Sequence, residues 1–143
     1  MLLDANLLLY ATDKSSPEYP LAAQWLSETL NGDRWVALPW QSIGAFLRIS
    51  THPRVTRNPL TGRQAWEIVE NWLAASPVWI PPTGIHTTRI LHALFDQTSI
   101  TGNLVPDAML AALAVEHGLV IYSADSDFAR FAEVRWVNPL RPK

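Results

Sequence analysis

The chain has 143 residues and a formal net charge of −2, and 48% of its residues are hydrophobic while 17% are charged. This composition fits one folded domain with a real core, and it excludes a disordered tail or a polybasic arm. The sequence contains no cysteine, which excludes disulfides, thiolate zinc sites and cysteine nucleophiles. The sequence has no apolar run of membrane-spanning length and no basic flank of a signal peptide, so we expect one cytoplasmic domain over residues 1–143.

Short apolar runs alternate with amphipathic helices in the first half of the chain. The expected elements are a strand, two helices, a strand and a helix, over residues 1–4, 5–13, 15–32, 34–39 and 40–51. The second of these helices has serine and proline at its start and Asn31–Gly32 as its stop. Ile43, Phe46 and Leu47 have helical spacing, and a loop rich in arginine and proline follows them.

The same alternation continues in the second half. The expected elements are a helix, a strand, two helices, a strand, a helical turn and a strand, over residues 61–76, 78–82, 83–99, 105–118, 119–125, 127–131 and 134–140. Thr61 is the expected N-cap of the first helix, and Gly118 lies just past the end of the third. Short apolar strands that alternate with helices favour an α/β fold with a parallel sheet covered on both faces.

Four aspartates lie where the strands of such a sheet end. Asp4 closes the first strand, Asp125 and Asp127 follow a later strand, and Asp107 lies in the first turn of the helix before that strand. In open α/β sheets, sites form beyond the carboxyl ends of the strands. We therefore expect the four carboxylates to converge at this edge.

Each aspartate also has an ordinary structural explanation. Asp107 would favour the positive end of its helix, and Asp125 would cap the turn after it, and both effects are common and worth about 0.5–2 kcal/mol. Asp127 is the easiest of the four to explain as a structural or supporting residue. Asp4 is the hardest, because it lies between apolar segments where burial without a partner is costly.

A cluster of carboxylates needs a cation to stay ionised, because like charges raise one another's pKa. The sequence has only two lysines, Lys14 and Lys143, and neither is near an aspartate of the expected cluster in the sequence. Oxygen ligands alone favour a hard ion, Mg²⁺ or Mn²⁺, over zinc. Such a site typically clamps a phosphate and activates a water, so phosphodiester hydrolysis is the expected reaction class.

Four segments taken together resemble a known family, and they occur in its order: MLLDANLLLYA, AFLRIST, VPDAMLAALAVEHG and YSADSDFARF. They are similar to the PIN domain, and specifically to the VapC toxins of type II toxin–antitoxin pairs. The resemblance implies an α/β/α sandwich with a central parallel sheet and an endoribonuclease that uses Mg²⁺, or Mn²⁺ in its place, to cleave structured RNA such as tRNA or rRNA. It also implies a homodimer that a cognate VapB-type antitoxin inhibits.

The resemblance extends to individual residues. It implies catalytic and metal-binding roles for Asp4, Asp107 and Asp125, a further metal-binding role for Asp127, and supporting roles for Asn6 and Ser123. Family members usually carry a glutamate just before the FLR-like segment, where this chain has Ala45. Gln41, one turn earlier, could reach the metal through water, but a neutral amide does not replace the charge. The alternative is a non-catalytic PIN domain that binds RNA or a protein.

Arginines around the helix over residues 40–51 are the expected RNA contacts. Arg48, Arg54 and Arg57 lie close together in the sequence, with Trp40 nearby as a stacking surface. Phosphate contacts supply affinity for RNA, and unpaired bases stack on aromatic side chains. An ordinary solvated loop explains these arginines equally well.

Overall fold

A five-stranded parallel sheet forms the centre of the fold, with the strand order β3-β2-β1-β4-β5. The structure is a computed structural model that describes residues 1–141, so residues 142–143 of the expected domain, with Lys143, lie outside the described range. The strands are β1 Leu2–Leu3, β2 Val36–Ala37, β3 Val78–Trp79, β4 Ile121–Tyr122 and β5 Trp136–Val137. The expected α/β fold with a central parallel sheet is confirmed.

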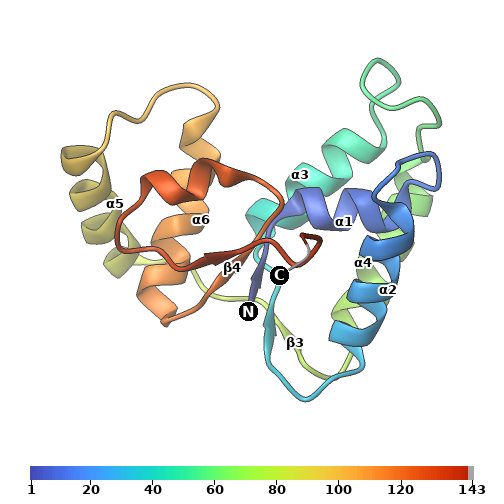
Figure 1. The fold of residues 1–143 in the computed structure, drawn as a ribbon, viewed down its shortest axis with the longest axis horizontal. Helices are drawn as coiled ribbons and strands as arrows, with labels where there is room; N and C mark the ends of the chain where they lie inside the picture. The colour runs from blue at the N-terminus through green and yellow to red at the C-terminus, as the bar shows by residue number, and fades with distance from the viewer. Residues whose placement is uncertain (142–143) are drawn as a thin grey trace.

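Helices cover both faces of this sheet (Figure 1). They are α1 Ala5–Thr12, α2 Tyr19–Leu30, α3 Trp40–Ser50, α4 Gly62–Leu73, α5 Ile85–Gln97, α6 Leu104–His117 and the 3₁₀ helix η1 Ser126–Arg130. Helices α5 and α6 lie on one side with η1, and α1 to α4 lie on the other. In the described part of the chain, no helix is both long and apolar enough to cross a membrane.

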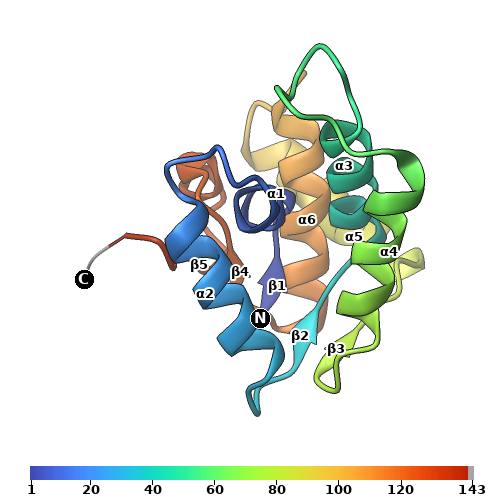
Figure 2. The same cartoon turned by 90° about the vertical axis from the view of Figure 1, so that its right-hand side faces the viewer.

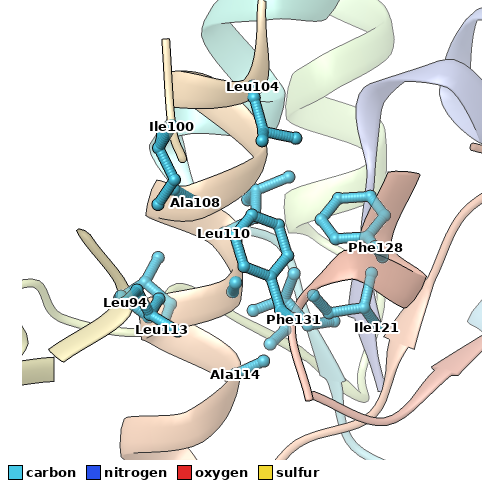
Figure 3. Close-up of a cluster of buried hydrophobic side chains, with 14 residues drawn as sticks. Leu94, Ile100, Leu104, Ala108, Leu110, Leu113, Ala114, Ile121, Phe128 and Phe131 are labelled. Atoms are coloured by element: carbon cyan, nitrogen blue, oxygen red, sulfur yellow. The ribbon is translucent and has the colours of Figure 1, made fainter. Parts of the chain in front are cut away.

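Alternate residues of the short strands face opposite cores, as the period of two in a strand requires. Leu2 of β1 and Ile121 of β4 face α6, where Phe128 and Phe131 from the η1 segment join them (Figure 3). Leu3, next to Leu2, faces the other core, which contains side chains of α3 and α4. The inner strands β1 and β2 are therefore buried on both faces, as is typical of a parallel sheet, while the outer strands β3 and β5 are partly exposed.

Local signals explain where some helices begin and end. Thr61 caps α4 as expected, and its hydroxyl and the Gln64 side chain form a reciprocal capping box. Gly118 ends α6 with φ of 65°, a left-handed conformation that glycine adopts without strain. The expected serine cap of α2 is wrong, because the helix begins at Tyr19 and Glu18 holds the N-cap position. The Ser16 hydroxyl bonds one turn earlier, accepting from the Glu18 backbone N–H and donating to the Glu18 carboxylate.

The strand register brings four chain segments level at the carboxyl edge. Leu2 pairs with Ala37 on one side and with Ile121 on the other, and Ala37 pairs with Trp79. Two residues further along each strand, Asp4, Pro39, Pro81 and Ser123 therefore lie side by side. Helix α6 runs back beside β1 and leads into the amino end of β4, so its first turn also lies near this edge (Figure 2).

Candidate functional site

Three carboxylates meet at the carboxyl edge of the sheet. Asp107 comes from α6, Asp125 and Asp127 come from the segment after β4, and one oxygen of each lies within 4.8 Å of the other two. Two oxygens bound to one Mg²⁺ lie at most about 4.2 Å apart, twice the usual bond length of about 2.1 Å. The three side chains therefore fit a shared hard cation after a small inward shift.

The turn after β4 holds two of these carboxylates in place. The Asp125 side chain caps η1 by accepting a hydrogen bond from the Asp127 backbone N–H, at 2.9 Å. Asp127 forms an ion pair with Arg130 at 3.5 Å, and both side chains are largely exposed. An exposed pair of this kind contributes about 0–1 kcal/mol. Asp125 thus both caps η1 and belongs to the acidic cluster, and the capping hydrogen bond orients its carboxylate.

Asp4 lies beside this group of three and is not a member of it. Its carboxylate accepts hydrogen bonds from the Ser123 hydroxyl and from the Ala5 backbone N–H, both at 2.7 Å. The second bond caps α1. The expected convergence therefore holds for three aspartates. Asp4 lies next to them, and its carboxylate is hydrogen-bonded to Ser123 and Ala5.

Ser123 links the two halves of the site. Its side chain is fully buried, and its hydroxyl donates to Asp4 while accepting hydrogen bonds from the Asn6 amide and the Asp125 backbone N–H, both at 3.0 Å. Asn6 also accepts a hydrogen bond from the Ala124 backbone N–H at 3.3 Å. These contacts join the start of α1 to the segment after β4, and they fit the supporting roles expected of Asn6 and Ser123.

Sequence reasoning missed Trp136, which belongs to the same network. The indole N–H of this β5 residue donates to the Ser123 backbone carbonyl at 2.9 Å. A tryptophan N–H usually finds a partner when the ring is buried. That tendency was the available signal, but the identity of the partner depends on the pairing of β5 with β4, which the sequence does not state.

The electrostatics of the site reflect crowded negative charge. The pKa of Asp107 is raised to about 7, mainly by burial and in addition by the negative charges of Asp125, Asp4 and Asp127. Burial also raises the pKa of Asp4, although its hydrogen bonds from Ser123 and Ala5 oppose the shift. Within residues 1–141, Arg130 is the only cationic side chain that pairs with any of the four. A divalent cation would neutralise this excess charge.

Helix α3 lies against the strand that carries Asp4. The buried Ser42 hydroxyl donates to the Leu3 backbone carbonyl at 2.6 Å, which fixes the first turns of α3 beside the end of β1. Ala45, three residues further on, is half-buried. The Gln41 amide donates to the Thr83 hydroxyl at 3.4 Å, so the structure directs it toward the segment after β3.

The expected RNA-binding arginines lie away from the acidic group. Arg48 is exposed in the last turn of α3, and Arg54 and Arg57 are exposed in the loop that follows. About 14 Å of helix separates Ser42 from Thr51, at 1.5 Å per residue. Arg57 also borders a hollow of about 480 Å³ between the ends of α1 and α3, and this hollow contains none of the four aspartates.

Residues 1–134, nearly the whole chain, match the PIN domain family. This chain belongs to the PIN domain family. Among PIN domains it belongs with the VapC ribonucleases: it is 42% identical over 139 residues to Ribonuclease VapC37 of Mycobacterium tuberculosis, and the match covers 96% of both chains.

Solved structures of PIN domains share the fold at low sequence identity. VapBC2 from Rickettsia felis, bound to a DNA fragment from its promoter, gives a TM-score of 0.67 at 16% identity over 96% of both chains. Mycobacterium tuberculosis VapC20, a toxin that cleaves the sarcin-ricin loop, gives 0.64 at 18% identity over 94% of this chain and 98% of the other. The PIN fold thus places the acidic cluster at the edge where sites form in open α/β sheets.

Proposed function

We propose that this VapC-family PIN domain is the toxin of a type II toxin–antitoxin pair and cleaves phosphodiester bonds in structured RNA, tRNA or rRNA, with Mg²⁺ at the acidic cluster. Mn²⁺ can substitute, because it accepts the same oxygen ligands. The observation that carries the proposal is the group of Asp107, Asp125 and Asp127, whose oxygens lie within 4.8 Å of one another.

Each acidic residue has a distinct task in this proposal. Asp107, Asp125 and Asp127 hold the cation, and Asp4 adds a fourth negative charge beside them, where its hydrogen bonds keep it oriented. A divalent cation bound by carboxylates supplies Lewis acidity toward phosphate oxygens and an activated water. Asp4, Asp107 and Asp125 are the proposed catalytic residues, and the mutual effect of their charges on the pKa values of Asp4 and Asp107 supports their lying close together.

The arginines at the far end of α3 would hold the rest of the RNA. Arg48, Arg54 and Arg57 are exposed and form no ion pair with the acidic group, which supports a role in contacting phosphates at a distance from the cut. Replacing one of these arginines by alanine should remove a phosphate contact. The slope of log affinity for RNA against log salt concentration should then fall by about one unit. Arg89→Ala on α5, on the other side of the sheet, is the matched control.

An antitoxin and a second copy of the chain are the proposed partners. The similar structure from Rickettsia felis is a VapBC complex, which supports a VapB-type antitoxin for this chain. We also propose a homodimer. Expression of this chain alone should arrest growth, and co-expression of the gene normally paired with it should restore growth.

Cleavage of RNA by the purified protein tests the proposed activity. Structured RNA should be cut with Mg²⁺ or Mn²⁺, cutting should stop with excess chelator, and Asp107→Asn should be inactive. Asp33→Asn, which removes an exposed carboxylate before β2, is the matched control and should cut normally. Equal cutting in excess chelator would refute the metal mechanism.

Ala45 favours a second candidate, the non-catalytic binder. Ala45 stands where the family usually has glutamate, and it lies on α3 beside the strand that carries Asp4. A non-catalytic domain would bind RNA equally well with Mg²⁺ or chelator and would cut it in neither. The same assay, read for binding as well as cleavage, separates the two candidates.

A further inference from the structure

We propose that Trp40 and the prolines after β3 form a stacking site for one unpaired base of the RNA, next to the bond that is cut. This inference rests on the proposed function and adds a substrate contact to it. Trp40 is the first residue of α3, and its side chain is 55% exposed. It borders an open hollow of about 730 Å³, lined by Trp40, Gln41, Ile80, Pro81, Pro82 and Thr83.

The hollow lies on the same edge of the sheet as the acidic cluster. Because Leu2 pairs with Ala37 and Ala37 pairs with Trp79, Asp4, Pro39 and Pro81 are level at the ends of three neighbouring strands. Neighbouring strands are about 4.8 Å apart, so Pro81, two strands away, lies roughly 10 Å from Asp4 along this edge. A strand of RNA with its scissile phosphate at the acids would therefore pass the indole with an adjacent nucleotide.

Hydrogen bonds hold the walls of the hollow before any ligand binds. The Gln41 amide donates to the Thr83 hydroxyl at 3.4 Å, which joins the first turn of α3 to the segment after β3. On the other side of that segment, the His117 ring nitrogen lies 3.0 Å from the Pro82 carbonyl oxygen. Because these walls are already ordered, less conformational entropy of the protein is lost when a ligand binds.

The chemistry of the lining favours a base over a phosphate. No residue that lines this hollow carries a charge, and the lining includes the indole of Trp40 and two prolines, Pro81 and Pro82. Stacking of a base on an aromatic side chain strengthens binding by roughly 5- to 150-fold and tolerates any base. The occupant is thus an unpaired nucleotide, in line with recognition of single-stranded loops in RNA.

Three variants test the stacking site, with RNA binding measured by fluorescence anisotropy in the inactive Asp107→Asn background. Trp40→Ala should weaken binding of a short RNA that contains the mapped cut site by about tenfold, and Trp40→Phe should keep most of the affinity. Trp35→Ala is the matched control, because Trp35 is 68% exposed at the opposite end of the same strand. It should bind like the parent.

RNAs with a single abasic nucleotide identify the occupant. At one position near the cut, the abasic RNA should bind the parent about as weakly as the intact RNA binds Trp40→Ala. Trp40→Ala should bind that abasic RNA no more weakly than it binds the intact RNA. Equal affinity of Trp40→Ala and the parent would overturn the inference, and so would additive losses at every position. If Trp40→Ala loses antitoxin binding while its RNA binding is unchanged, the inference is also overturned, because the hollow then binds a protein.

Cleavage by the wild-type chain distinguishes failure of this inference from failure of the proposed function. If the wild-type chain cuts RNA and Trp40→Ala raises KM while kcat stays within about twofold, both stand. If the wild-type chain cuts and Trp40→Ala leaves KM unchanged, only the stacking site fails. If the wild-type chain does not cut, the proposed function fails, and the parent, Trp40→Ala and Trp35→Ala are then compared for binding of a single-stranded RNA of mixed sequence. Weaker binding by Trp40→Ala alone supports the stacking site, and equal binding by all three overturns it.

Discussion

The Ser123 hydroxyl is the single group on which the geometry of the acidic edge most depends. A hydroxyl offers one donor and two acceptor positions, and all three are used here, toward Asp4, Asn6 and the Asp125 backbone. The side chain is fully buried, so no water replaces a lost partner without a rearrangement. The three residues would each lose a hydrogen bond if the hydroxyl were removed.

Ser123→Ala should therefore destabilise the protein by about 1–3 kcal/mol, the usual cost of unsatisfied buried polar groups. It should also raise the pKa of Asp4 further, because the Ser123 hydrogen bond lowers that pKa. Denaturant unfolding measures the loss. Ser27→Ala on the exposed side of α2 is the control and should change stability by less than about 0.5 kcal/mol. An equal, small effect of both substitutions would contradict the network.

Asp107 gives the metal-free protein a specific pH dependence. Its pKa rises from 3.8 to about 7 on folding, so the folded chain binds more protons than the unfolded chain between these values. Stability should therefore fall as the pH rises from about 4 to about 7, and the loss should be complete above that range. The carboxylate is costly to ionise in the fold unless a cation is present.

Asp107→Asn should remove this dependence. In chelator at pH 8 the variant should melt at a higher temperature than the wild-type chain. The difference should vanish below about pH 3, where the Asp107 carboxyl is protonated in both the folded and the unfolded chain. No hydrogen bond to the Asp107 side chain exists in residues 1–141, so asparagine loses no partner. A variant that is less stable than the wild-type chain at pH 8 would show that the carboxylate is a structural cap.

Helix α3 is the element that decides how complete the metal site is. The Ser42 hydroxyl holds the helix beside the end of β1, and Ala45 follows three residues later on the half-buried side. Ala45→Glu should place a carboxylate near the cluster, so cleavage should saturate at about tenfold lower Mg²⁺ concentration. The metal-free variant should melt earlier, because one more like charge joins the group.

Gly44→Glu separates this effect from a general effect of added charge on α3. Gly44 is exposed, and an added Cβ would meet no atom within 4 Å. Glutamate is a better helix former than glycine, so this variant should gain up to about 1 kcal/mol and keep the Mg²⁺ requirement of the wild-type chain. If Ala45→Glu also leaves the metal requirement and the melting temperature unchanged, residue 45 does not face the site.

Helices with strong local signals were predicted well, and elements set by tertiary contacts were not. The Thr61 cap of α4 and the glycine end of α6 follow from short-range chemistry, and both are confirmed. The start of α2 is not, because Ser16 forms a turn with Glu18 and the helix begins only at Tyr19. The strand expected over 119–125 pairs only at Ile121–Tyr122, since ladder length depends on neighbouring strands rather than on hydrophobicity.

At the scale of the whole molecule, topology explains why the site could be foreseen in outline. Parallel strands end at one edge, so residues that follow different strands meet there however far apart they lie in sequence. The register between β1 and β4 sets Asp4 beside Ser123, to which it is hydrogen-bonded. The packing of α6 and the turn after β4 bring Asp107, Asp125 and Asp127 together. Side-chain partners of that kind are decided by packing, and the sequence pattern does not contain them.

Calorimetric titration of Mg²⁺ into the purified protein at pH 7 tests the central claim, that the clustered carboxylates hold a divalent cation. The wild-type chain and Asp33→Asn should show saturable binding with release of protons, because Asp107 has a pKa of about 7 and must ionise to bind. Proton release should disappear well above pH 8, and Asp107→Asn should bind at least about tenfold more weakly. Wild-type affinity in Asp107→Asn, or no binding by the wild-type chain, would contradict the account.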